Sequence, residues 1–438
     1  MSGQARVRFE FWFRLFVLAG ILRGGWLAAN AASLRSDPDT YRQLARNLLA
    51  DGTFGYRLSD PAAGRPRVQP TAYRPPLYPL VLAAVGWVDD VGSVSVAILH
   101  WILGVATVLL VYRLSQDWGL GRWGLLAAML VACDPILLNQ SSLVMTETLA
   151  ALLAVLAVLC LTRSAAATES RTSGIQLVLA GASVALAALC RPTFLVWAAA
   201  IGLALLLASR TPSPRRFRLA GVFALSAGAV LAPWAIRNAC VFDRFLVTTT
   251  HGGYTLWLGN NPEFYRFLQQ SRWGDVWDSR HLDQQYLQVR RPYGNDELLA
   301  DRWAYDQAVA TISHEPASFL RACIFRVGSL WGVVPHQVDA AESVGKRLAR
   351  YAVGAWYAAL LALAVVGAGI LGRQLCYPPW LWGLLLCLTF TAMHTIYWSN
   401  LRMRAPLMPV ICLAATVGVR WIVSRTSRPR AAGQESSP

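Results

Sequence analysis

Lysine is almost absent from this chain: Lys346 is the only one among 40 basic residues, and all the others are arginines. Charged residues of every kind make up 15% of the 438 residues, whereas hydrophobic residues make up 55% and the mean hydropathy is +0.40. A soluble core of this size does not need so many apolar residues, and several apolar runs approach the length that crosses a bilayer. The composition therefore excludes a soluble globular protein and predicts an all-α, polytopic membrane protein.

The glycine patterns that hold nucleotides are also missing. Neither a Walker nor a Rossmann pattern is present, which argues against direct use of ATP or of a dinucleotide. The eight cysteines contain no CxxC pair and lie mostly in or beside apolar runs, where small buried thiols are ordinary, so a zinc site is not expected. Cys240 and Cys323 could pair on the external side, but two free thiols are the favoured interpretation.

Metal ligands are equally hard to find in the polar stretches. Asp278, His281 and Asp283 lie close together in the sequence, but neither their spacing nor their order matches a metal site. We expect the loop that carries them to be solvated. The sequence indicates no required cofactor, and it is compatible with a bound divalent cation.

The net charge of +16 would indicate nucleic-acid binding in a soluble protein. Here most basic residues lie in short loops between apolar runs, where positive charge marks the cytoplasmic side of a membrane protein. No nucleic-acid partner is therefore expected, and both termini are assigned to the cytoplasm. About ten spans are expected, near residues 11–33, 94–112, 123–139, 144–161, 174–190, 193–209, 219–236, 351–372, 379–397 and 405–423.

Two long loops, 34–93 and 237–350, fall on the opposite, external side. We expect a single transmembrane domain over residues 1–438, in which the first long loop is catalytic and residues 424–438 form a cytoplasmic tail. Three short links fall on the external side as well, at residues 140–143, 190–193 and 398–404.

The second long loop contains one apolar segment, Ala317–Pro335. Arg321 and Arg326 interrupt this segment, so we expect a helix that lies along the external interface and not an extra span. An extra span would also move the arginines of the tail to the outside, against the charge rule.

The first external loop begins with an acidic pair directly after the first span. Asp37 precedes Pro38, whose fixed φ suits the first turn of a helix, so one interpretation of Asp37 is a helix N-cap and nothing more. Its place just beyond a span also puts a carboxylate at the depth of a lipid phosphate. A carboxylate at that depth could act as a general base for a nucleophile that attacks beside the phosphate. Asp39 is expected to steer substrate or to favour the helix dipole.

Two further features carry charge where a membrane protein usually avoids it. Glu147 is the only carboxylate of its span, which suggests a function, although a hydrogen-bonded or snorkelling acid at a helix end is the alternative. Arg402 and Arg404 lie in a short external link where the charge rule predicts few basic residues. A guanidinium fork matches phosphate oxygens and would stabilise a phosphate leaving group. Binding to ordinary anionic headgroups is the alternative for this pair.

Three motifs in the first loop together resemble the GT-C class of membrane glycosyltransferases. They are DxxxY from Asp37, ARNLL from Ala45 and RPPLYP from Arg74. The pattern is similar to the bacterial branch of the family that includes protein O-mannosyltransferases and lipid A aminoarabinose transferases. Later stretches are similar to the same family: PWAIRN from Pro233, GGY from Gly252 and LWLGNNP from Leu256.

The resemblance implies roles for particular residues. The catalytic carboxylate of the family corresponds to Asp37, and the basic residue that contacts the carrier phosphate corresponds to Arg74. Relatives often have a second acid and a Glu where this chain has Pro38 and Tyr73. The catalytic residues expected are Asp37 and Glu147, and the substrate-binding residues expected are Asp39, Tyr41, Arg74, Arg237, Asn238, Asn260, Arg402 and Arg404.

The resemblance also implies an activity. We expect a GT-C-like glycosyltransferase that moves a hexosyl or pentosyl group from a polyprenyl-phosphate donor to a hydroxyl of a protein, lipid or glycan. Transfer would be an inverting single displacement at the external, periplasmic face of a bacterial inner membrane. The alternative is a flippase or transporter of lipid-linked sugars, which would place polar residues near the bilayer midplane on broken helices. This chain gathers its acids and arginines at one face instead.

Overall fold

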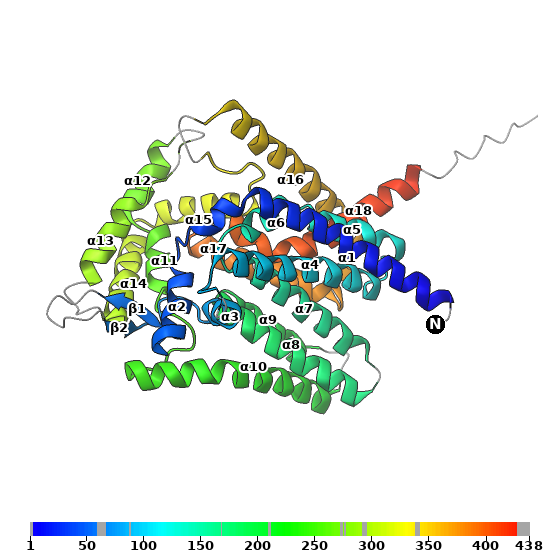
Figure 1. Cartoon of the computed structure of the whole chain (residues 1–438), viewed down its shortest axis with the longest axis horizontal. Helices are drawn as coiled ribbons and strands as arrows, with labels where there is room; N and C mark the ends of the chain where they lie inside the picture. The colour runs from blue at the N-terminus through cyan, green and yellow to red at the C-terminus, as the bar shows by residue number, and fades with distance from the viewer. Residues whose placement is uncertain are drawn as a thin grey trace, which may run out of the picture.

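The computed structural model describes residues 3–58, 67–86, 89–167, 169–208, 212–271, 275, 277–290, 296–337 and 342–426. Helices make up nearly all the regular structure of this part of the chain (Figure 1). Two described strands, β1 (Gly55–Leu58) and β2 (Arg67–Pro70), pair antiparallel as a ribbon in the first loop. Residues 427–438, which form most of the expected tail, lie outside the described residues.

Seven helical stretches among the described residues are long and apolar enough to cross a membrane. They correspond to all or most of the helices α1 (Gly3–Ala29), α4 (Ser93–Asp117), α7 (Glu147–Ala166), α8 (Ser170–Cys190), α10 (Ser213–Phe242), α16 (Val344–Leu371) and α18 (Met408–Thr426). The prediction of an all-α polytopic membrane protein is therefore confirmed.

The other expected spans are built differently. One is a bent pair, in which η2 (Gly121–Trp123) and α5 (Gly124–Ala132) meet α6 (Pro135–Ser141) at 50°. Two are shorter apolar helices, α9 (Phe194–Leu206) and α17 (Trp380–Ile396). Each of these segments coincides with a span expected from the sequence.

The bend between α5 and α6 follows from the dipeptide Asp134-Pro135. Pro135 has no N–H with which to continue α5, and its ring suits the first position of a new helix. The Asp134 carboxylate accepts a 2.9 Å hydrogen bond from the N–H of Leu137 and so caps α6. The sequence dictates the break locally.

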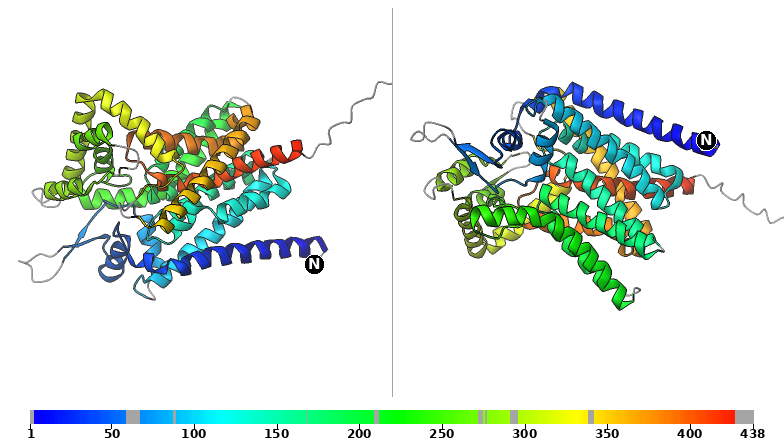
Figure 2. Two further views of the ribbon diagram at one scale, coloured as in Figure 1. Left: turned by 90° about the horizontal axis from the view of Figure 1, so that it is seen from above. Right: turned by 60° about the horizontal axis from the view of Figure 1, so that its bottom comes forward.

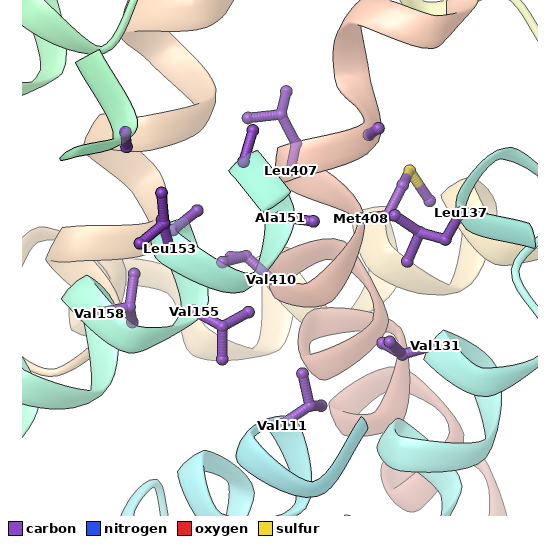
Figure 3. Packing of buried hydrophobic residues seen from close by; sticks show 14 of the residues in the cluster. Val111, Val131, Leu137, Ala151, Leu153, Val155, Val158, Leu407, Met408 and Val410 are labelled. Carbon is purple, nitrogen blue, oxygen red and sulfur yellow. The ribbon is translucent and has the colours of Figure 1, made fainter. Parts of the chain in front are cut away.

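The spans pack through branched aliphatic side chains and small residues. Figure 3 shows buried side chains of α4, α5, α6 and α7 around the start of α18, where Val410 lies. α16 and α18 approach closely at Gly367 and Gly418. A Cβ at Gly367 would lie 1.9 Å from the carbonyl oxygen of Ala414. Small residues at such crossings permit the backbone contact through which membrane helices associate.

Both long loops fold at one end of the helical bundle, and the N-terminus lies at the other end (Figures 1 and 2). The first loop forms η1 (Ala31–Arg35), α2 (Tyr41–Asp51), the β1–β2 ribbon and α3 (Leu77–Gly86). The second loop forms α11 (Gly252–Gly259), α12 (Pro262–Gln270), α13 (Arg280–Arg290), α14 (Glu297–His314) and α15 (Pro316–Trp331).

Glu297, at the start of α14, ties the two loops together. Its buried carboxylate accepts hydrogen bonds of 2.5 Å from both the hydroxyl of Thr71 and the N–H of Ala72. The N–H of Thr250 donates to the carbonyl of Ala72 at 3.0 Å. Removing these donors would leave a buried carboxylate poorly satisfied, which is costly. The end of the first loop therefore depends on the second loop for its shape.

α15 covers most of the segment expected to be an interfacial helix, and it is not among the stretches long enough to span. Arg326, which interrupts the apolar pattern, is fully buried. Its guanidinium donates to the carbonyls of Gly259 and Thr395, so it joins α15 to α11 and α17. That α15 lies along the membrane interface stays a prediction.

The placement of both long loops at one end predicts a labelling pattern. In a background without native cysteines, Arg280→Cys in α13 should react with an impermeant maleimide in intact cells. Arg215→Cys, near the start of α10 and equally exposed, should react only after permeabilisation. The reverse pattern would show that the assignment of sides is wrong.

Asp301 in α14 supports the start of α11 at an electrostatic cost. Its carboxylate accepts a 2.7 Å hydrogen bond from the N–H of Gly253. Burial raises the pKa of Asp301 to about 6, and the nearby Glu297 carboxylate raises this pKa further. The hydrogen bond from the N–H of Gly253 opposes the increase. The unfolded-state pKa is about 3.9. Because the folded-state pKa is higher, the contribution of Asp301 to stability is full below about pH 4 and is lost as the pH rises through about 6.

The variant Asp301→Asn should therefore be more stable than the parent at pH 7, by about 1–2 kcal/mol once partial exposure is allowed for. Its apparent melting temperature should change less than that of the parent between pH 4 and pH 6. Asp306→Asn, on the exposed side of the same helix, is the matched control and should leave the pH dependence unchanged. Parallel curves for the parent and Asp301→Asn would contradict the prediction.

Candidate active site

A cavity of about 690 Å³ lies where the two long loops meet the end of the helical bundle. The first loop contributes Asp39, Tyr41 and Arg74 to its lining. The bundle contributes the ends of α7 and α8 and the 3-10 helix η4 (Leu401–Leu407). The second loop contributes residues of α11 and α13. The cavity has the size of a typical ligand site and collects segments from the whole length of the chain.

Glu147 forms the centre of a buried ion cluster in this cavity. It is the first residue of α7, where the helix N-terminus favours a carboxylate, and its side chain is 1% exposed. One carboxylate oxygen, Oε1, lies 2.8 Å from Nη1 of Arg191 and 3.8 Å from Nε of Arg402. Two guanidinium groups thus face one carboxylate, so the cluster carries a net positive charge. Such a cluster suits an anionic ligand group.

Asp39 and Arg74 form a second ion pair in the cavity lining. Nη2 of Arg74 donates to Oδ1 of Asp39 at 2.8 Å. The guanidinium also lies over the rings of Tyr41 and Tyr73, at 5.8 and 5.3 Å. Burial lowers the pKa of Arg74, but neighbouring Tyr41 and Asp39 raise it more, so the pKa lies above its ordinary value. Arg74 is therefore a firmly held cation that contacts both a carboxylate and an aromatic surface.

Asp37 lies beside the cavity and does not line it. Its Oδ2 accepts hydrogen bonds from the N–H groups of Arg42 and Gln43, at 2.9 and 3.2 Å. Burial raises the pKa of Asp37, and these two N–H groups oppose the shift. The expected helix start at Pro38 is wrong, because Thr40 is left-handed with φ 60° and α2 begins at Tyr41. This turn brings Asp39 into the cavity lining in place of Asp37.

Two of the residues expected to bind substrate lie on α10 and contact neighbouring backbone carbonyls. Arg237 donates to the carbonyls of Thr71 and Phe54, at 2.9 and 3.1 Å, and so fastens the first loop to α10. Asn238 is fully buried and donates to the carbonyl of Leu246 at 3.0 Å. Neither residue lines the cavity.

Asn260 and Arg404 are also placed outside the cavity lining. Asn260 is fully buried and donates to the carbonyl of Ile396 at 3.0 Å. Arg404 donates to the carbonyls of Leu330 and Gly332, at 3.2 and 2.6 Å, and lies over the ring of Tyr357. The expected pair of external arginines thus separates into Arg402, which lines the cavity, and Arg404, which is buried behind it.

Sequence reasoning missed several residues that line the cavity. Arg191 lies in the short external link 190–193, so the charge-rule argument applied to Arg402 could have found it. The second loop also contributes His251, Tyr254 and Asp283. No sequence pattern marks these three as site residues, and the stretch that contains Asp283 was expected to be solvated. Within the described part of the chain, no group of three or more His, Cys, Asp or Glu side chains could hold a metal ion.

Comparison with known proteins connects this fold with membrane glycosyltransferases. Residues 73–236 match a protein family described as dolichyl-phosphate-mannose-protein mannosyltransferase. The oligosaccharyltransferase of Archaeoglobus fulgidus, solved with a tethered acceptor peptide, has the same fold, with a TM-score of 0.54 and 16% identity over 95% of this chain. The chain spans about half of that protein, because the match covers 50% of it. The resemblance to the GT-C class is confirmed by these two findings.

A second solved structure is similar at a lower level. It is ArnT from Cupriavidus metallidurans bound to undecaprenyl phosphate, with a TM-score of 0.45, 14% identity, and coverage of 94% of this chain and 78% of that chain. No curated protein gives a significant sequence match to this chain. The fold shared with the oligosaccharyltransferase, together with the apolar helices, is that of a GT-C polytopic membrane protein.

The separation of Arg402 from Arg404 predicts different effects for two similar substitutions. Arg404→Gln should lower the stability of the purified protein by about 1.5–3 kcal/mol, because hydrogen bonds from a charged donor to two buried carbonyls are lost. Arg402→Gln should change stability by less than about 0.5 kcal/mol. Melting temperatures in zwitterionic detergent would measure both. Equal losses for the two variants would contradict the separation.

Proposed function

We propose that the protein is a glycosyltransferase that moves a sugar from a polyprenyl-phosphate donor to an acceptor hydroxyl at the external face of the membrane. The observation that carries this proposal is the cavity in which the Asp39–Arg74 pair lies with Glu147, Arg191 and Arg402. The match to a mannosyltransferase family over residues 73–236 supports the same reaction class. This chemistry is compatible with the transfer of either a hexosyl or a pentosyl group.

The arginines would hold the carrier phosphate. Arg191 and Arg402 carry two positive charges and Glu147 carries one negative charge, so one positive charge is in excess. A singly charged phosphate that enters the cavity pairs with this excess, and no buried charge is left unpaired. Guanidinium groups match phosphate oxygens and stabilise the charge that develops as the phosphate leaves. Glu147 would keep both guanidinium groups oriented, and in this scheme it is a positioning residue.

Asp39 would act as the general base in place of Asp37. Asp39 lines the cavity, and its carboxylate, paired with Arg74 at 2.8 Å, can accept a proton. Phosphate binding near Arg74 would draw the guanidinium toward the phosphate and free the carboxylate. The acceptor hydroxyl then gives its proton to Asp39 while its oxygen bonds to the anomeric carbon. The bond from that carbon to the phosphate oxygen breaks with inversion, and the lipid phosphate departs.

A flippase or transporter has less support. The bent pair of α5 and α6 is a broken helix of the kind that transporters use. However, the Asp134 carboxylate at its break accepts a 3.0 Å hydrogen bond from the hydroxyl of Tyr357 and caps α6, and it does not line the cavity. The polar groups at this break serve packing.

The proposal predicts a difference between two neighbouring acids. In a deletion strain complemented with variants, Asp39→Asn should lower transfer by about 10²–10⁴, the usual range for loss of a general base. Asp37→Asn should retain most transfer, because an amide oxygen can still accept the N–H groups of Arg42 and Gln43. Mass spectrometry of envelope glycans and of lipid-linked sugars would measure product lost and donor accumulated.

Three outcomes of this experiment are informative. Loss of transfer in Asp37→Asn alone would return the base to Asp37. Full transfer in both variants would remove the carboxylate mechanism. A deletion strain with unchanged envelope glycans and unchanged lipid-linked sugars would overturn the proposed activity itself.

A further inference from the structure

Aromatic rings line the part of the cavity that the two long loops build. The ring of Tyr73 lies 4.4 Å from that of His251, in an edge-on arrangement. His251 stacks on Tyr254 at 5.2 Å, and Tyr254 lies 4.8 Å from Tyr286. All four residues line the cavity, and we call them the aromatic wall. Three loop segments that are far apart in the sequence build this wall, so it is a product of the tertiary fold.

The charged residues of the cavity lining differ between the bundle side and the second-loop side. Its arginines among the described lining residues are Arg74, Arg191 and Arg402, which come from the first loop and the bundle. The second loop adds one carboxylate, Asp283, which accepts a hydrogen bond from the hydroxyl of Tyr254. Arg191 and Arg402, on the bundle side, suit a phosphate, and the carboxylate on the second-loop side does not. Arg74, which lies over the ring of Tyr73, stands between the two.

We propose that the aromatic wall binds a neutral sugar ring and that the acceptor of this enzyme is therefore a glycan. This inference rests on the proposed glycosyl transfer. The C–H faces of a sugar ring pack against aromatic rings, whose faces carry partial negative charge. The hydroxyl groups of the sugar can donate hydrogen bonds to the Asp283 carboxylate, and they can donate to or accept from the tyrosine hydroxyls.

The direction of the reaction assigns this sugar to the acceptor and not to the donor. In a single displacement, the nucleophile approaches opposite the leaving group. The phosphate leaves toward Arg191 and Arg402, on the bundle side of the cavity. Arg74 pairs with Asp39 and also contacts Tyr73. The Asp39 carboxylate, the proposed base, therefore lies between the arginines of the bundle side and the aromatic wall. An acceptor on the wall can therefore present its hydroxyl to Asp39 from the side opposite the phosphate.

The test uses the purified full-length protein and two probes measured separately. Farnesyl phosphate reports on the phosphate site, and neutral trisaccharides of mannose, glucose and galactose report on the aromatic wall by saturation-transfer NMR. We expect at least one trisaccharide to bind to protein that is already saturated with farnesyl phosphate. Tyr254→Leu should weaken trisaccharide binding about tenfold or more, which corresponds to about 1.4 kcal/mol, and leave farnesyl phosphate binding unchanged.

Controls separate this effect from a loss of folding. Tyr254→Phe keeps the ring and should weaken trisaccharide binding less than Tyr254→Leu does. Phe267→Leu removes an aromatic ring of the same external loop that does not line the cavity, and it should leave both probes unaffected. Arg402→Gln should weaken farnesyl phosphate binding about tenfold while trisaccharides still bind.

The outcomes distinguish this inference from the proposed function. If farnesyl phosphate binds but no trisaccharide does, the glycan acceptor is refuted and the transferase is not. If farnesyl phosphate competes with the trisaccharide, the sugar occupies the donor site and the assignment to the acceptor is wrong. Preferential binding of a serine- and threonine-containing peptide, or of a uronic-acid trisaccharide, would refute a neutral glycan. Failure of farnesyl phosphate to bind the folded parent would count against the proposed function instead.

Discussion

The site depends on a single buried carboxylate and the two guanidinium groups that neutralise it. Glu147 opens α7, one of the most buried helices of the bundle, and a carboxylate there without partners would cost several kcal/mol. Arg191, at the end of α8 and 2.8 Å from the carboxylate, removes most of that cost, and Arg402 in η4 lies farther away, at 3.8 Å. The cluster therefore brings three distant segments together at one end of the bundle. The same cluster leaves a surplus of positive charge, on which binding of a phosphate would depend.

Arginine performs a second task in this structure, as a clamp on backbone carbonyls. Arg42 is buried and donates to the carbonyls of Leu34 and Val91, at 2.6 and 2.8 Å. Other buried or half-buried arginines do the same at the ends of α10, α15 and η4. Helix ends and loops leave carbonyls without intrahelical partners, and a guanidinium group can satisfy several of them at once. An ammonium group lacks the planar fork, so the near absence of lysine has a structural consequence as well.

These two uses of arginine explain where the structure places the arginines expected in the site. Arg74 and Arg402 lie in the cavity and Arg237 and Arg404 lie behind it, although all four are arginines near the external end of a span. Their sequence contexts are similar, and only the carbonyls that surround each side chain decide between the roles. The presence of Asp39 in the cavity lining, where Asp37 was expected, has a comparable cause. It follows from the left-handed conformation of Thr40, which shifts the helix start by three residues and which residue types alone do not specify.

The sequence by itself determined the membrane class, the positions of the spans and the break at Asp134-Pro135. These follow from local physics: apolar length against bilayer thickness, the missing N–H of proline and the cost of charge near a span. The tertiary structure alone decided which acid enters the cavity, that Arg191 joins Glu147, and that Tyr73 meets His251 and Tyr254. Those contacts join segments far apart in the chain, and packing of the two external loops on the bundle end creates them. No local pattern encodes that packing.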